Sequence, residues 1–89
     1  MFTKSNKYSE YIKEHNEGAF ASHTTYKFPN GYGASVIHGT LTSELEATVI
    51  RWHDNHWSTD YLTPITNDVI GYIGYIDDLD AVLEDIYNL

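Results

Sequence analysis

Two closely spaced histidines in this 89-residue chain have a residue type and spacing that suggest a metal site. His53 and His56 flank Asp54-Asn55, so both imidazoles can point to the same side of a tight turn, with Asp60 further along that side. A catalytic zinc site needs three protein ligands, each oriented by further hydrogen bonds. Two ligands at an exposed turn do not meet this requirement. We therefore interpret both histidines as surface residues and predict no metal site and no cofactor.

Nucleophilic catalysis has still less support in the residue pattern. The chain contains no cysteine, which removes a Cys nucleophile, a thiolate zinc site and a disulfide framework. It has no Gly-x-Ser-x-Gly motif, and no local pattern groups a serine with a histidine and an aspartate. Gly31, Gly33 and Gly39 are not followed by the lysine of a phosphate-binding loop. We expect that the protein is not an enzyme, and we assign no catalytic residue.

The formal net charge of −8 is unevenly distributed along the chain. Four lysines balance four glutamates in residues 1–45, so the excess of acid lies in residues 46–89, where Arg51 is the last basic residue. Contacts to nucleic acid or to an anionic membrane require cations, so both partners are disfavoured and a basic protein surface is favoured. The chain lacks both a signal-peptide apolar region and the roughly 20 apolar residues of a membrane span. We expect a soluble, cytoplasmic protein.

The elements that must position these residues begin with a predicted N-terminal helix. Ser5 or Asn6 can cap it, and Tyr8, Tyr11 and Ile12 recur at the i, i+3, i+4 spacing of one helix face. Gly18 is a plausible C-terminal glycine for this helix.

Two β-hairpins are predicted next. In the first, Pro29-Asn30-Gly31 suits a three-residue loop, which pairs Phe28 with Tyr32, Tyr26 with Ala34 and Thr24 with Val36 on a core face. The second turns at Asp54-Asn55 and pairs Trp52 with Trp57 and Ile50 with Thr59. We expect the tryptophan face to point into the core. The opposite face is largely polar and is expected to face solvent, and it carries Val49, Arg51, His53, His56, Ser58 and Asp60.

A short acidic helix is predicted at the C-terminus. Asp77 can cap it, and its apolar stripe is formed by Leu79, Val82, Leu83, Ile86 and Leu89. The predicted fold is therefore a single α+β domain spanning residues 1–89. It has an N-terminal helix, a four-stranded antiparallel sheet of two hairpins and a short C-terminal helix, with both helices on one face of the sheet.

Two segments of the chain resemble a family of small, acidic, uncharacterised phage-type proteins. GYGASVIHG (residues 31–39) matches a strand with the pattern YGASV, and DYLTPITNDVIGYI (residues 60–73) matches a later YDTPITDDVIGYL segment that precedes a short acidic helix. The chain departs from the family where Tyr61-Leu62-Thr63 replaces Tyr-Asp-Thr and where residues 38–45 form a shorter stretch. The resemblance implies an accessory protein made in the cytoplasm of an infected bacterium, and it implies no catalytic residue.

These observations favour a protein that binds and modulates a host protein through an acidic, tyrosine-rich surface. One form of this hypothesis is that its carboxylates imitate the phosphates of DNA in a basic groove. Two alternatives remain open: a structural or self-assembling module, such as a dimer formed through an open sheet edge, and a small metal- or ligand-binding protein. The candidate interaction residues are acids and tyrosines expected outside the core: Asp60, Asp68, Tyr72, Tyr75, Asp78, Glu84 and Asp85.

Overall fold

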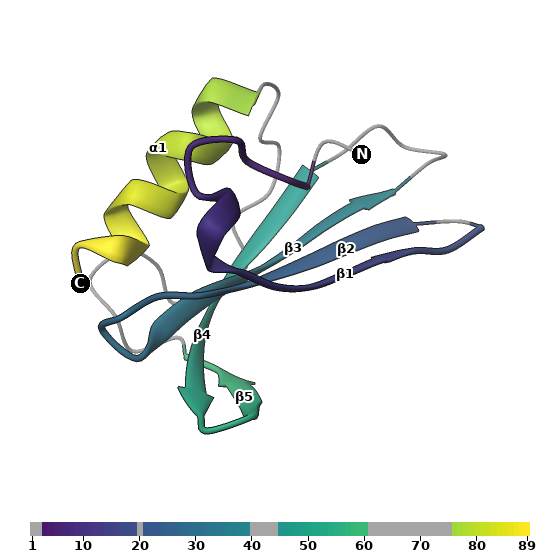
Figure 1. The fold of residues 1–89 in the computed structure, drawn as a ribbon. Coiled ribbons are helices and arrows are strands. Elements are labelled where there is room, and N and C mark those ends of the chain that lie inside the picture. The colour runs from purple at the N-terminus through teal and green to yellow at the C-terminus, as the bar shows by residue number, and fades with distance from the viewer. Residues whose placement is uncertain (1–2, 20, 40–44, 61–75) are drawn as a thin grey trace.

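The computed structural model describes residues 3–19, 21–39, 45–60 and 76–89. They form a five-stranded antiparallel sheet with strand order β1-β2-β3-β4-β5 and one helix packed on a face of the sheet (Figure 1). The N-terminal segment lies beside that helix on the same side of the sheet (Figure 1). In chain order the elements are a 3-10 turn η1 (Ser9–Tyr11), β1 (Ile12–Glu17), β2 (Ala21–Lys27), β3 (Tyr32–Gly39), β4 (Leu45–His53), β5 (His56–Thr59) and α1 (Ile76–Tyr87).

The prediction of an N-terminal helix is wrong, and so is the prediction of a sheet with four strands. Tyr8 and Tyr11 are joined by the single turn η1, in which the Tyr11 N–H donates to the Tyr8 carbonyl at 3.0 Å, and β1 begins at the next residue. β1 pairs with β2 from Ile12 onward, with an irregularity between Ile12 and Glu14. A short polar helix is marginal by itself. In the fifth strand, β1, residues 12–17 instead share backbone hydrogen bonds with β2.

The first hairpin has the predicted register. Thr24 pairs with Val36 and Tyr26 with Ala34, and the Phe28 N–H donates to the Tyr32 carbonyl at 2.9 Å. Gly31 closes the loop with a φ of +87°, a backbone conformation that glycine adopts without steric strain.

The second hairpin confirms the strand pairing but not the assignment of its faces. Trp52 pairs with Trp57 and Ile50 with Thr59, as predicted. Neighbouring residues of a strand point to opposite faces, yet Val49 and Ile50 both have an exposed fraction of 0%. Both faces of β4 are therefore buried in this part of the sheet. Val49 belongs to the core beneath α1, so its predicted place on a solvent-facing side is wrong.

The core between the sheet and α1 follows the predicted helix stripe. Leu79, Leu83 and Ile86 are fully buried, and Val82 and Leu89 pack against the same cluster. The helix begins at Ile76, one residue before its predicted cap, Asp77. The sheet and the N-terminal segment complete the core with Tyr8, Tyr26, Phe28, Ala34, Val36, Leu45, Ala47 and Val49.

Candidate functional site

The structure describes only part of the predicted interaction surface. Glu84 and Asp85 are exposed on α1, as expected for residues off its apolar stripe. Asp60 follows β5 and is half-buried, and its backbone N–H donates to the Val49 carbonyl at 2.9 Å. Asp78 lies in the first turn of α1, but its side chain is outside the described part of the chain. The remaining candidates also lie outside the described residues: Asp68, Tyr72 and Tyr75.

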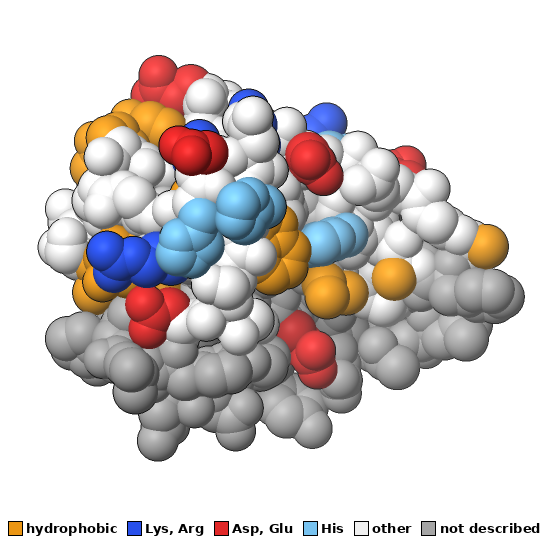
Figure 2. Space-filling view, turned by 90° about the horizontal axis from the view of Figure 1, so that it is seen from below, with side chains coloured by type: hydrophobic (Ala, Val, Ile, Leu, Met, Phe, Trp, Pro, Cys, Tyr) orange, Lys and Arg blue, Asp and Glu red, His pale blue; other side chains and the backbone are white. Residues whose placement is uncertain are grey.

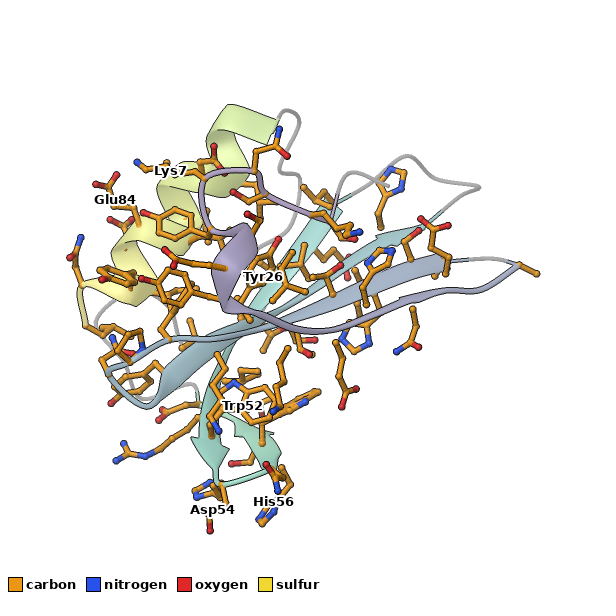
Figure 3. The ribbon with its side chains drawn as sticks, viewed as in Figure 1. Lys7, Tyr26, Trp52, Asp54, His56 and Glu84 are labelled. Atoms are coloured by element: carbon orange, nitrogen blue, oxygen red, sulfur yellow. The ribbon has the colours of Figure 1, made fainter. Side chains whose placement is uncertain are left out.

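The N-terminal segment lies against the acidic side of α1. The Ser5 hydroxyl donates to the carboxylate of Asp80 and accepts a hydrogen bond from the Tyr8 N–H at 3.2 Å. Further along the helix, the Lys7 ammonium is 3.9 Å from the Glu84 carboxylate, and both side chains are more than half exposed (Figure 3). The acidic residues of α1 thus have different environments. Asp80 joins the packing, whereas Glu84 forms a solvent-exposed ion pair.

Three tyrosines meet where η1 approaches the C-terminal end of α1, and we call Tyr8, Tyr11 and Tyr87 the tyrosine patch. Their ring centroids are 5.9 Å apart for Tyr8–Tyr87, 5.5 Å for Tyr11–Tyr87 and 6.3 Å for Tyr8–Tyr11. Phe28 lies edge-on to all three rings and is 2% exposed. Exposure rises from 6% at Tyr8 to 36% at Tyr87. The patch therefore has a buried floor and an accessible rim.

Three carboxylates act on the rings of the tyrosine patch. The pKa of Tyr8 is raised by burial and, to a smaller extent, by Glu84 and Asp80, while Lys7 acts in the opposite direction. The pKa of Tyr11 is raised to about 12, first by its hydrogen bond to Tyr87, then by burial and by Glu10. Negative charge beside the rings favours a nearby cation, as does the negative face of the rings themselves.

The protein's own cations already lie over aromatic rings. The Lys7 ammonium is 5.5 Å from the Tyr8 ring centroid, and Lys27 is 5.2 Å from the ring of Trp52. The Arg51 guanidinium lies 5.2 Å from the Tyr32 ring. Three of the five basic side chains are therefore engaged in intramolecular contacts of this kind.

A buried chain of hydroxyl groups lies between the N-terminal segment and β2. The Tyr26 hydroxyl donates to the Thr3 carbonyl at 2.5 Å and accepts from the Ser5 N–H at 2.8 Å. The Thr24 hydroxyl shares hydrogen bonds with Thr3 Oγ1 at 2.8 Å and with His15 Nδ1 at 2.6 Å. Thr3, Thr24 and Tyr26 are each 0% exposed, so a substrate cannot reach them and the network holds the N-terminal segment in place.

The histidines do not form a metal site among the described residues. His53 and His56 are stacked at the tip of the β4–β5 hairpin, with ring centroids 5.7 Å apart and Ser58 Oγ 3.1 Å from His53 Nε2. His23 bonds to Ser35 Oγ at 2.8 Å and lies edge-on to Trp57. Histidine and hydrophobic side chains are neighbours on the face seen in Figure 2. Within the described residues, no three histidine or acidic side chains gather closely enough to hold a metal ion.

Trp52 is a packing residue rather than an open platform for a ligand. It is 8% exposed, and its indole N–H donates to the Tyr26 carbonyl at 2.8 Å. Lys27 lies over the ring and donates to the backbone carbonyl of Asp54 at 2.7 Å. Both contacts hold Trp52 between the first hairpin and the Asp54 turn (Figure 3).

No protein-family model matches the chain, and no similarity was found to a curated protein or to a solved structure. Within the described residues, none of the helices has the length and apolar character needed to cross a membrane.

The sequence pattern pointed to Glu84 and Asp85 but missed the tyrosine patch. The spacing of Tyr8 and Tyr11 predicts the apolar stripe of a helix, and no sequence pattern marks Tyr87 as an interaction residue. The available signal was the high tyrosine content, eight residues in all, since tyrosine suits interfaces as well as small cores. No local pattern joins η1 to the opposite end of the chain.

Proposed function

We propose that this protein is a phage-type accessory protein that binds and modulates a host protein and catalyses no reaction. The observation that carries this proposal is the tyrosine patch together with the exposed carboxylates of Glu10 and Glu84, which act on Tyr11 and Tyr8. Tyrosines supply large contact areas at interfaces, and the carboxylates select a partner with a basic surface.

The distribution of charge supports the same conclusion. Lys7, Lys27 and Arg51 each lie over one of the protein's own rings, and Lys27 and Arg51 also donate hydrogen bonds within the fold. Exposed carboxylates at Glu84 and Asp85 add to the net charge of −8. Such a field accelerates encounters with basic proteins, and this acceleration declines as salt is added.

Capture from bacterial lysate with paired variants tests the proposal. The immobilised protein is compared with E84Q/D85N, which neutralises two carboxylates on α1, and with E46Q/D54N, which neutralises two exposed carboxylates on β4 and at its turn. Asn suits position 54 because it tolerates the positive φ of 61° found there. We expect a host protein whose recovery falls with added salt and with E84Q/D85N but not with E46Q/D54N. Recovery that ignores salt, or that falls equally with both variants, would reject the proposal.

The sheet supports one alternative function, self-association through β1. In the described sheet β1 is an edge strand that pairs with β2, and a strand at an edge presents backbone groups to a second chain. Light scattering over a range of protein concentrations distinguishes this alternative. An oligomer that forms with rising concentration and ignores salt would favour it over binding to a basic host protein.

A further inference from the structure

We infer, building on the proposed function, that the tyrosine patch, with its exposed rim at Tyr87, and the Glu84 carboxylate form a binding site for an arginine side chain of the partner. In the free protein Lys7 occupies this site, and the partner's arginine replaces it. The inference adds to the proposed function the chemical group that is recognised and the residue that competes for the site.

The position of Lys7 shows what the site accepts. Its ammonium lies over the Tyr8 ring, 5.5 Å from the centroid, and 3.9 Å from the Glu84 carboxylate. An aromatic face and a carboxylate thus act on the same cation from two elements, the N-terminal segment and α1. The Tyr87 ring adjoins Tyr8 at 5.9 Å and is 36% exposed, so it extends the aromatic surface beyond the part covered by Lys7.

Lys7 is weakly held and can be exchanged. The side chains of Lys7 and Glu84 are 56% and 55% exposed, and their 3.9 Å separation exceeds the length of a hydrogen bond. Exposed ion pairs of this kind contribute little to stability because water competes for both charges. Lys27 differs, since its ammonium donates a 2.7 Å hydrogen bond to the distant Asp54 carbonyl, whereas the hydrogen bond of Lys7 is to the side chain of its sequence neighbour Tyr8.

Arginine suits this site better than the resident lysine does. The guanidinium is planar and weakly hydrated, so it stacks on an aromatic ring, and its fork of N–H groups matches both oxygens of a carboxylate. A partner arginine can therefore stack on the tyrosine patch and bond to Glu84 at the same time. An ammonium is more strongly hydrated and lacks this fork.

The remaining cation–aromatic pairs are less suited to the same exchange. At Tyr32 the Arg51 guanidinium also donates to the hydroxyl of that tyrosine at 3.3 Å, so the pair already includes an arginine. At Trp52 the Lys27 ammonium donates to the backbone carbonyl of Asp54. This carbonyl is neutral, so it offers an incoming arginine no negative charge. The site of Lys7 combines an exposed carboxylate, an adjoining exposed ring and an occupant that arginine can outcompete.

Calorimetry with a hexa-arginine peptide at low salt tests the inference, with two pairs of charge-matched variants. K7Q removes the occupant, and K13Q makes the same charge change at an exposed position on β1. E84Q removes the site's carboxylate, and E46Q does the same at an exposed position on β4. All four positions are exposed, and thermal melting checks that each variant is folded.

We expect K7Q to bind hexa-arginine more tightly than K13Q, and E84Q to bind it more weakly than E46Q, each by roughly two- to fivefold. Hexa-lysine should bind the wild type less tightly than hexa-arginine does. If K7Q matches K13Q and E84Q matches E46Q while binding remains salt-dependent, the arginine site is rejected and the proposed basic partner stands. If hexa-arginine does not bind at low salt, both proposals are rejected.

Discussion

Asn30, in the turn between β2 and β3, donates a hydrogen bond from its side-chain amide to the backbone carbonyl of Ile86 at 2.9 Å. The same amide lies 3.0 Å from the carbonyl of Tyr87, and Asn30 Oδ1 accepts from the Tyr32 N–H at 3.0 Å. The last carbonyls of a helix have no partner within the helix itself. Asn30 supplies a partner for these carbonyls. It thereby links the C-terminal end of α1, which carries Tyr87, to the first hairpin.

Replacing Asn30 by alanine should therefore destabilise the protein. We expect a loss of about 1–2 kcal/mol in the free energy of unfolding, because the helix carbonyls and the Tyr32 N–H lose their side-chain partner. Urea unfolding of N30A and of N16A, an exposed change on β1, measures the difference. Equal midpoints for the two variants would show that Asn30 does not hold the helix end.

Two glycines of the first hairpin should respond very differently to alanine. A Cβ at Gly33 would lie 1.9 Å from the Tyr26 carbonyl oxygen and 2.7 Å from Trp52 Nε1, so the strands or the indole must move. A Cβ at Gly31 meets no atom within 4 Å, but the φ of +87° strains any residue other than glycine. We expect G33A to cost about 3 kcal/mol or more and G31A about 1 kcal/mol. Urea unfolding that ranks G31A as the worse variant would contradict this packing.

Ionisation of the Tyr26 hydroxyl should destabilise the folded protein in strong alkali. Burial raises its pKa to about 12 in the folded protein, whereas an unfolded tyrosine ionises near pH 10. Between these values the unfolded chain has lost the proton that the folded protein retains, so the free energy of unfolding falls as pH rises from 10 towards 12. Denaturant unfolding at several pH values should give a steeper decline for wild type than for Y26F. Parallel declines would show that Tyr26 ionises equally in both states.

Protein purified without a histidine tag should contain no stoichiometric metal. His53 and His56 stack on each other at the hairpin tip, and the described residues add no third ligand. Elemental analysis after dialysis measures the metal content. One equivalent of retained zinc that is lost in H53A would contradict this prediction and restore the metal-binding alternative.

The two hairpins could be predicted from the sequence because their turns are specified locally. Pro29-Asn30-Gly31 and Asp54-Asn55 determine loop length, and loop length determines which residues face each other across the strands. The apolar face of the C-terminal helix could also be predicted from the sequence. Leu79 and Leu83 follow the helical period, and both are fully buried.

The N-terminal segment could not be assigned correctly by the same reasoning. The spacing of Tyr8, Tyr11 and Ile12 fits one turn of α-helix, but it also fits a 3-10 turn followed by a strand. The choice between them depends on pairing with β2, which no local pattern reveals. The tyrosine patch escaped prediction for the same reason, because Tyr87 joins Tyr8 and Tyr11 only when the two ends of the chain meet.

The most direct test of the account is an NMR titration of the ¹⁵N-labelled protein with hexa-arginine, read residue by residue. We predict that the largest shift changes fall at Tyr8, Tyr11, Glu84 and Tyr87, and that they weaken when salt is added or Glu84 is replaced by glutamine. The acidic positions Glu46 and Asp54, which are exposed elsewhere on the surface, should change little. Changes centred on Glu46 and Asp54, or spread evenly over all exposed carboxylates, would contradict a basic partner that docks on the tyrosine patch.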